Sequence, residues 1–356
     1  MINQIEPVIT EEDIANVDEY LRSGAWLTEH ILTKKLEKEI SEYLGRSYGV
    51  AVPNGTVAIY LALKARGIGL GHRVAVPNIT MIATINAVIW AGADPVLIDV
   101  DESLCMSFES LKKITKPEAV IFVPLNGRTG NGLEIEKWCS ENEILLIEDS
   151  AHALGSEYTE KKCGSLGEMS ILSFTPHKII TSGQGGLVLT DDEVLYTKMY
   201  DYKSFNRKED SSDWHKGFGL NFKFTDLQAS LLLSQLTRLD SLIESKKFIY
   251  SLYTSNASNP KDRYLSFQDH ETPWFVDFLL VEGEEQDTYK EFLHKRNIEI
   301  RKGYPPLSMQ QMFTETERTD LTYSEEIAKK IIWLPSSINL SEADIRVVSS
   351  SLESFN

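Results

Sequence analysis

Short apolar stretches alternate with helical stretches from Leu36 to about Leu239, and this alternation limits the possible folds more than any other feature. Helical stretches such as Thr56–Lys64 and Met81–Ala91 separate strand-like runs that are rich in Val, Ile and Leu. Strands of this composition are typical of a parallel sheet covered by helices on both faces. The pattern therefore predicts an α/β fold with βα units around a mostly parallel sheet. We expect seven strands, at Tyr48–Val52, Arg73–Val76, Asp94–Ile98, Ala119–Val123, Ile144–Ile147, Met169–Ser173 and Gly186–Leu189.

The pattern changes after the last of these units and predicts a second domain. Apolar residues recur at three-to-four spacing over Asp226–Ser245, which predicts one long helix closing the large domain. The polar stretch Thr254–Arg263 follows it. We expect a large domain over residues 1–245 and a smaller C-terminal α+β domain over residues 246–356. Within these limits we expect a strand at Trp274–Val281, a helix at Asp287–Arg296, and surface loops at Arg207–Lys216 and Thr314–Glu326.

Charge and composition exclude several classes of protein. The chain of 356 residues carries 36 Lys and Arg against 53 Asp and Glu, a net charge of −17, and it lacks the basic stripe that a nucleic-acid surface needs. Neither a long apolar run nor a signal-peptide pattern is present, so we expect a cytoplasmic protein without a membrane partner. The cysteines are scattered and are expected to be reduced, and the histidines show no metal-binding spacing.

Polar residues follow three of the predicted strands, where ligands of open α/β sheets gather. The first group, Asn54, Gly55 and Thr56, opens a helical run. Free backbone N–H groups and the positive end of the helix dipole suit a phosphate at such a turn. The same residues are equally compatible with a plain turn in which Thr56 caps the helix.

The other two groups contain residues that can handle protons. Asp149 follows the strand-like run ILLI, and its carboxylate is either a solvated strand end or a partner for a protonated ring nitrogen. Lys178 follows the strand that ends at Ser173 and precedes the glycine-rich turn Gly183–Gly186. A lysine in this position is either a surface charge or, if burial lowers its pKa, a nucleophile and base.

Taken together and in this order, these motifs resemble the sugar aminotransferases of the DegT/DnrJ/EryC1/StrS family, which depend on pyridoxal 5'-phosphate (PLP) and have the type I aminotransferase fold. The resemblance covers nearly the whole chain. The motifs that carry it are NGTVAIYLALKARGIGLGHRVAVPNITMIATINAVIWAGADPVLIDVD, EDSAHALGS, SFTPHKIITSGQGGLVLTDD, GFGLNFKFTDLQASLLLSQL, RKGYPPL and WLPSSINLSEADI.

The resemblance implies a role for each of the polar groups. Lys178 would form the internal Schiff base with PLP, and Asp149 would pair with the pyridine nitrogen. The phosphate would be held by Gly55, Thr56 and Ser173. No metal ion is implied.

Five further residues receive implied roles. Asn221, in the motif GLNFKF, would reach the phosphate of the neighbouring subunit, which implies a homodimer with shared active sites. His152 replaces the usual Gln near the ring hydroxyl, and Met81 replaces an aromatic ring, so that a thioether would contact the cofactor. Arg301 and Tyr304, in RKGYPPL, are the residues expected to contact substrate.

The implied reaction is a transamination between an amino acid and a sugar. The turn SGQGG and the motifs RKGYPPL and LPSS are most similar to the perosamine-synthase branch. That branch aminates C4 of a nucleotide-linked 4-keto-6-deoxy sugar, with L-glutamate as the suggested amino donor, in the biosynthesis of surface polysaccharides such as O-antigen. Lys178 would carry the proton between the amino-acid Cα and the cofactor C4′.

Alternative functions on this sequence are distinguished by register and charge. A sugar 3-dehydratase of the same fold has histidine in place of the lysine, but the offset of five residues from Ser173 puts Lys178, not His177, in the catalytic register. Amination at C3 of a 3-keto sugar stays open. A non-catalytic cofactor-binding regulator is disfavoured by the acidic charge, and an NAD enzyme by the missing G-x-G-x-x-G fingerprint.

Overall fold

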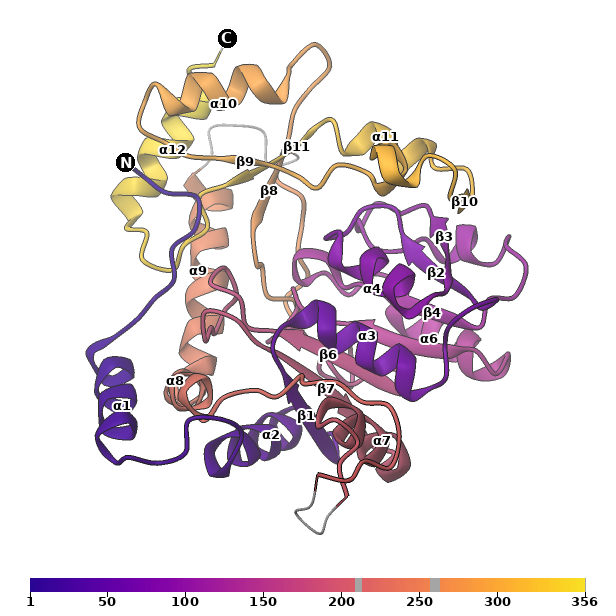
Figure 1. The fold of residues 1–356 in the computed structure, drawn as a ribbon. Helices are drawn as coiled ribbons and strands as arrows, with labels where there is room; N and C mark the ends of the chain where they lie inside the picture. The colour runs from indigo at the N-terminus through magenta and orange to yellow at the C-terminus, as the bar shows by residue number, and fades with distance from the viewer. Residues whose placement is uncertain (209–212, 257–262, 356) are drawn as a thin grey trace.

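The computed structural model describes residues 1–208, 213–256 and 263–355, and within these ranges it contains one large and one small β-sheet (Figure 1). The large sheet has eight strands, and all seven predicted strands are among them. In spatial order they are β1 (Tyr48–Val52), β7 (Gly186–Thr190), β6 (Met169–Ser173), β5 (Leu145–Asp149), β4 (Ala119–Phe122), β2 (Arg73–Pro77), β3 (Asp94–Ile98) and β10 (Glu317–Arg318).

The large sheet is mostly parallel, as predicted. Strands β2 to β6 and β10 pair in parallel, whereas β7 runs antiparallel between β1 and β6. The residues of β4, β5 and β7 are buried throughout or nearly so, as expected for strands between two helical layers. The helices that pack on this sheet are α2 (Ile31–Leu44), α3 (Gly55–Ala65), α4 (Ala83–Ala91), α6 (Gly132–Glu141) and α7 (Glu193–Lys203).

The eighth strand corrects one prediction. Thr314–Glu326 was expected to be a surface loop, but it contains β10 and the start of α11 (Thr322–Ile327). The two residues of β10 extend the sheet beside β3, and an ion pair joins Arg73 to Glu317. Hydrophilic residues are therefore ordered here by edge pairing rather than by burial. The other predicted loop, Arg207–Lys216, lies partly outside the described residues, at 209–212.

The predicted long helix over Asp226–Ser245 is also wrong in detail. The chain forms α8 (Asp226–Leu236) and a separate helix α9 (Leu239–Asn256), with a break at Thr237 and Arg238. Arg238 turns toward the first helix, α1 (Glu11–Arg22), where its Nη2 lies 2.6 Å from an oxygen of Asp13. The predicted domain boundary at 245–246 falls within α9 and stays a prediction.

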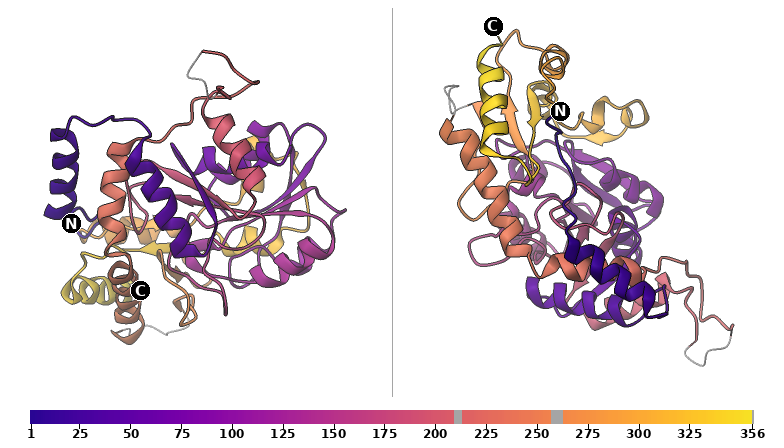
Figure 2. Two further views of the ribbon diagram at one scale, coloured as in Figure 1. Left: turned by 90° about the horizontal axis from the view of Figure 1, so that it is seen from below. Right: turned by 90° about the vertical axis from the view of Figure 1, so that its left-hand side faces the viewer.

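The small sheet lies beside the C-terminal half of α9, at the end of that helix farther from α8 (Figures 1 and 2). It has three strands in the order β8 (Val276–Leu279), β11 (Ile331–Leu334) and β9 (Arg301–Lys302). Helix α10 (Gln286–His294) follows β8, and α12 (Glu342–Glu353) packs against α9. The predicted strand at 274–281 and helix at 287–296 are thereby confirmed. Ile2, near the N-terminus, lies here too, because it pairs with Ile298.

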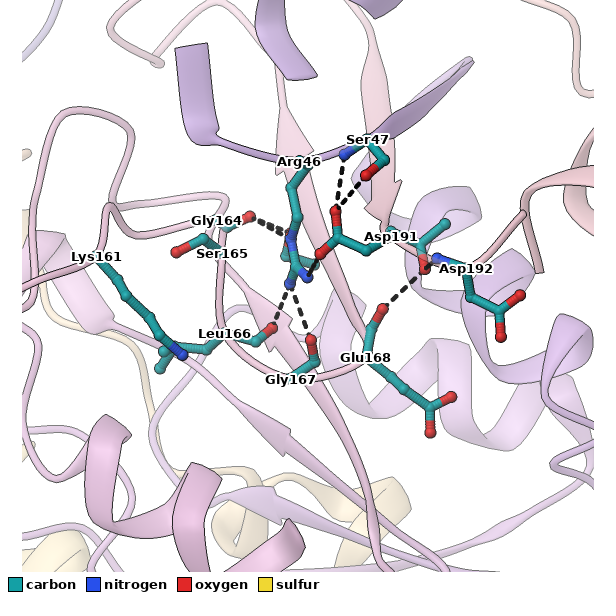
Figure 3. A network of polar contacts seen from close by, with 12 residues as sticks. Arg46, Ser47, Lys161, Gly164, Ser165, Leu166, Gly167, Glu168, Asp191 and Asp192 are labelled. Carbon is teal, nitrogen blue, oxygen red and sulfur yellow. Dashed lines mark hydrogen bonds and ion pairs between the residues drawn. The ribbon is translucent and has the colours of Figure 1, made fainter. Parts of the chain in front are cut away.

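A hydrogen-bonded network joins three segments at the amino-terminal edge of the parallel strands (Figure 3). Arg46 is buried, and its Nη2 donates to the carbonyl oxygens of Leu166 at 2.7 Å and Gly167 at 3.0 Å. Its Nη1 lies 2.8 Å from Asp191 Oδ2, and the other oxygen of Asp191 accepts from the Ser47 N–H at 2.8 Å. We call these contacts the Arg46 network.

None of the helices in the described ranges is long and apolar enough to cross a membrane. The three cysteines are buried free thiols, and burial raises the pKa of Cys105 and of Cys139 to about 12.

Candidate active site

The carboxyl ends of β5 and β6 open into a cavity of about 650 Å³. This is the edge of the sheet where the sequence predicted a ligand. Residues from the small-sheet part of the chain close the cavity from the other side. The predicted site residues that line it are Gly55, Thr56, Met81, Asp149, His152, Ser173, Lys178, Arg301 and Tyr304.

One wall of the cavity is the first turn of α3. The side chain of Asn54 caps this helix by accepting the Val57 N–H at 3.0 Å, so the alternative in which Thr56 is the cap is wrong. The amides of Gly55 and Thr56 begin the helix, where N–H groups lack intrahelical partners and carry the positive end of the dipole. A Cβ at Gly55 would lie 3.2 Å from the Ser173 Cβ, so the missing side chain keeps this turn close to β6.

Asp149 ends β5 and is buried rather than solvated, so the interpretation as a solvated strand end is wrong. Its Oδ2 accepts the Thr84 hydroxyl at 2.9 Å, and its Oδ1 accepts the Ala151 N–H at 3.3 Å. Burial raises the pKa of the Asp149 carboxyl, and the two hydrogen bonds and the charge of Lys178 oppose that rise. A positively charged ligand group in the cavity would favour the ionised carboxylate further.

Lys178 lies in the cavity wall and is partly buried, so it is not a surface charge. Burial among the surrounding atoms lowers the pKa of Lys178 to about 7, and the charge of Asp149 acts in the opposite direction. Its Nζ lies 3.8 Å from the centroid of the Trp274 ring. An amine that is partly neutral near pH 7 can act as a nucleophile and as a base.

His152 packs against two aromatic side chains. Its ring centroid lies 4.1 Å from that of Trp274 and 5.8 Å from that of Tyr304. Burial, with a smaller effect from the charge of Lys178, holds the pKa of His152 well below its usual value, so the ring is neutral at pH 7. Its Nδ1 is buried and has no hydrogen-bond partner among the described residues, so this atom can bind a ligand group.

The outer side of the cavity carries positive charge. Arg301 begins β9 and lies close enough to His177 to lower the pKa of that imidazole, although burial is the larger cause of the lowering.

Two uncharged residues complete the predicted set. Met81 is 43% exposed at the cavity wall and accepts the Ala83 N–H at its sulfur. Tyr304 packs edge-on against Trp333 at 4.8 Å.

Asn221 was predicted to act in the neighbouring subunit's site, and that role stays a prediction. In this chain Asn221 is exposed, pairs with Ser204 and is not among the described residues that line the cavity. Trp274 and Thr84 contact the two central groups but were not predicted. The only sequence signal for Trp274 is its place at the start of a predicted strand.

The donors of the cavity fit PLP. The first turn of α3 suits its phosphate, Asp149 suits a protonated ring nitrogen, and the unpaired Nδ1 of His152 suits a ring substituent. Lys178 supplies the amine. A model of the DegT/DnrJ/EryC1/StrS aminotransferase family matches residues 7–353. The chain belongs to this family. It is a PLP-dependent sugar aminotransferase, and both the predicted fold class and the predicted cofactor are confirmed.

Named relatives of this DegT/DnrJ/EryC1/StrS aminotransferase agree with that assignment. A GDP-perosamine synthase of Escherichia coli O157:H7 is 32% identical over 354 residues, which are 98% of this chain and 97% of that protein. Among solved structures, the aminotransferase TlmJ from Streptoalloteichus hindustanus has a TM-score of 0.92 and 27% identity, covering 99% of this chain and 98% of that one. A candidate sugar aminotransferase from Streptococcus pneumoniae, in its PMP form, has a TM-score of 0.90 and 25% identity, covering 99% and 98%.

Proposed function

We propose that this aminotransferase converts a nucleotide-linked 4-keto-6-deoxy sugar to the 4-amino sugar, with L-glutamate as the amino donor, for the biosynthesis of a surface polysaccharide. The observation that carries the reaction type is Lys178, whose pKa is lowered to about 7, in the same cavity as the buried Asp149. The choice of C4 is supported by the likeness to GDP-perosamine synthases.

Each cavity residue then has a defined task. PLP, when bound, supplies an electron sink that accepts charge from the bond broken at the substrate carbon. Asp149 keeps a proton on the ring nitrogen, because an ionised carboxylate favours the charged partner. The amides of Gly55 and Thr56, with the Ser173 hydroxyl, bind the phosphate.

Lys178 is the proton carrier. It removes the proton from the Cα of the donor amino acid and, in the second half of the reaction, delivers a proton to the sugar carbon that gains the amine. A pKa of about 7 suits both directions, because neutral amine and ammonium are then both populated near neutral pH. Neutral His152 would bind near the ring hydroxyl, and the Met81 thioether would pack on the cofactor.

The sugar nucleotide would enter from the positively charged side of the cavity. Arg301 is exposed there and carries a permanent charge that suits a diphosphate. Tyr304 lies deeper, 3.4 Å from His152 Nε2 through its hydroxyl, and would contact the sugar.

We further propose a homodimer in which Asn221 contacts the cofactor phosphate of the neighbouring subunit. Asn221 faces solvent, and Trp214 and Phe218 nearby in the chain are 69% and 71% exposed. Exposed aromatic side chains of this size suit an interface between subunits. The cytoplasmic location stays a prediction.

One experiment separates this function from its alternatives. The purified enzyme is incubated with L-glutamate and a panel of GDP-, dTDP- and UDP-linked 4-keto and 3-keto sugars, and products are identified by mass spectrometry and NMR. A 4-amino sugar is expected. A 3-amino sugar would identify the C3 aminotransferase and a dehydrated sugar the 3-dehydratase, and absence of turnover with the whole panel would contradict the proposed substrate class.

The lysine assignment is tested in the same preparation. Borohydride reduction of the PLP-loaded enzyme followed by peptide mapping is expected to place the label on Lys178. Lys178→Ala is expected to fold and to lose transamination, because it lacks the amine that binds PLP and moves the proton. A label on another lysine would contradict the assignment.

A further inference from the structure

Trp274 contacts the two groups closest to the proposed chemistry. It lies two residues before β8, forms part of the cavity wall and is 4% exposed. Its ring centroid lies 3.8 Å from the Nζ of Lys178 and 4.1 Å from the centroid of the His152 ring. Its own conformation therefore affects both residues.

Hydrogen bonds hold both the indole ring of Trp274 and its backbone in position. Its Nε1–H donates to the backbone oxygen of His177 at 2.7 Å, directly beside Lys178. Its backbone N–H donates to the backbone oxygen of Asn126 at 3.0 Å, and its carbonyl oxygen accepts from Lys246 Nζ at 2.8 Å. Moving the ring away from Lys178 would break the hydrogen bond from its N–H, which lies on a buried residue, to the His177 oxygen.

We propose that Trp274 is a positioning residue that holds the ammonium of Lys178 on its aromatic face whenever that lysine is free of the cofactor. The proposal rests on the role given to Lys178 under Proposed function. The negative face of an indole attracts a cation, and the attraction is larger where water is excluded. The ring thus opposes the effect of burial, because it favours the protonated form that burial disfavours.

Several other charged or titratable groups act on the same ammonium. The carboxyl of Asp149 raises the pKa of Lys178, and the lysine charge in turn lowers the pKa of His152 and of His177, whose pKa Arg301 also lowers. Tyr304 completes this side of the cavity. A test must therefore change the ring while leaving these five groups in place.

Two substitutions of the same residue isolate the aromatic face. Trp274→Phe and Trp274→Leu both lose the hydrogen bond to the His177 oxygen and both reduce the side-chain volume. Only the Phe variant keeps an aromatic face below Lys178 Nζ. The difference between the two variants therefore reports the cation–π contact rather than packing or the lost hydrogen bond.

The measurement is trace acetylation of Lys178 by acetic anhydride as a function of pH, quantified by peptide mass spectrometry. The full-length chain is used saturated with pyridoxamine phosphate, in which Lys178 is free, and also without cofactor. In both preparations we expect Lys178 to titrate about one pH unit lower in the Leu variant than in the Phe variant. The neutral, reactive amine would then be about tenfold more populated below the midpoint.

The controls define what would overturn the proposal. Trp138→Leu makes the same change on α6, where the ring packs against Phe108, and should leave the titration of Lys178 unchanged. Equal titration in the Phe and Leu variants, or a higher pKa in the Leu variant, would mean that the ring only packs. If Trp274→Leu does not fold, Trp274→Met takes its place as the apolar variant without an aromatic face. Failure of pyridoxamine phosphate to bind, with the expected order kept in the cofactor-free chain, would count against the proposed function alone.

Discussion

Burial determines the properties of the single residues in the active site. The cavity raises the pKa of Asp149 and lowers that of Lys178, so the charged form of each is disfavoured and each partly stabilises the other. Such groups cost folding free energy. Strongly perturbed pKa values are nevertheless concentrated at functional sites, because catalytic acids, bases and nucleophiles need pKa values matched to their task. A positively charged ligand group beside Asp149 would reduce this cost, because it favours the ionised carboxylate.

Asp149→Asn is expected to keep PLP bound and to slow transamination strongly. A neutral amide cannot hold the ring nitrogen protonated. Loss of the charge-assisted hydrogen bond alone removes about 1.5–3 kcal/mol of stabilisation, which corresponds to a roughly 10- to 150-fold lower rate of transamination. Turnover and the absorbance spectrum of the bound cofactor measure the effect. Thr84→Val, which removes one donor to Asp149 but keeps the charge, should lose less activity. Unchanged turnover in the Asn variant would rule out the proposed role.

Residues at strand ends could be predicted from the sequence, whereas long-range contacts could not. Lys178 and Asp149 follow buried strands within local motifs, so their place at one edge of the sheet follows from the strand pattern. Trp274 lies 97 residues from His177, whose carbonyl oxygen it binds, and no local pattern specifies that contact. The helix cap was open for a similar reason, because Asn54 and Thr56 are both suitable and geometry selects Asn54.

At the scale of elements, composition predicted the buried strands but not the elements that depend on a partner. The strands β1 to β7 are apolar and were found, whereas β10 is Glu317–Arg318 and exists only because β3 offers a free edge. The break between α8 and α9 was missed because apolar spacing continues across it, while Arg238 is turned toward Asp13 by an ion pair.

The Arg46 network makes a prediction about the elements that it joins. Arg46→Met keeps the apolar stem but leaves buried carbonyl oxygens, such as those of Leu166 and Gly167, without their donor. The variant is expected to lose about 2–3 kcal/mol in free energy of unfolding. Urea denaturation measures this loss. Activity per folded molecule should not change, because Leu166 and Gly167 precede β6, whereas the cavity lies at the carboxyl end of that strand.

A matched arginine lies in the same region of the chain. Arg66→Met breaks the ion pair between Arg66 and Glu168, in which the side chain of Arg66 is 51% exposed and that of Glu168 is 38% exposed. Exposed pairs of this kind contribute about 0–1 kcal/mol, so the control should lose much less stability than Arg46→Met. Equal losses in the two variants would show that burial of the Arg46 network has no special effect.

At the scale of the whole molecule, the active site depends on contact between the two sheets. Asp149 ends β5 and Lys178 follows β6 of the large sheet, whereas Trp274 precedes β8 of the small sheet. Arg301 begins β9 of the small sheet, and Tyr304 follows that strand. Helix α9 spans both, and its buried Lys246 donates to the carbonyl oxygens of Trp274 and Ser336 at 2.8 and 2.6 Å. The resemblance of motifs predicted this arrangement as a fold, but the residues that dock the two parts are spread over the chain.

The proposed homodimer with shared active sites is tested by combining two inactive variants. If Asn221 holds the phosphate in the neighbouring site, Asn221→Ala damages the partner's site and Lys178→Ala damages its own. A heterodimer of these inactive variants then has one site with both defects and one with neither. Activity should return on co-expression with different tags, up to about one intact site per heterodimer by the symmetry of the interface. Steady-state turnover of the doubly purified heterodimer measures the recovery.

A second pair of variants provides the control for that recovery. Lys178→Ala and Asp149→Asn affect groups that the same chain brings into one cavity, so each site of their heterodimer keeps one defect and no activity should return. Recovery of activity in the Asn221 pair without recovery in the Lys178–Asp149 pair can arise only if Asn221 acts across the interface. Random subunit exchange or partial activity would affect both pairs alike. If neither heterodimer is active and Asn221→Ala alone is inactive, Asn221 acts in the site of its own chain. Its solvent-exposed position would then require a movement of the 218–224 segment toward the cavity, rather than a second subunit.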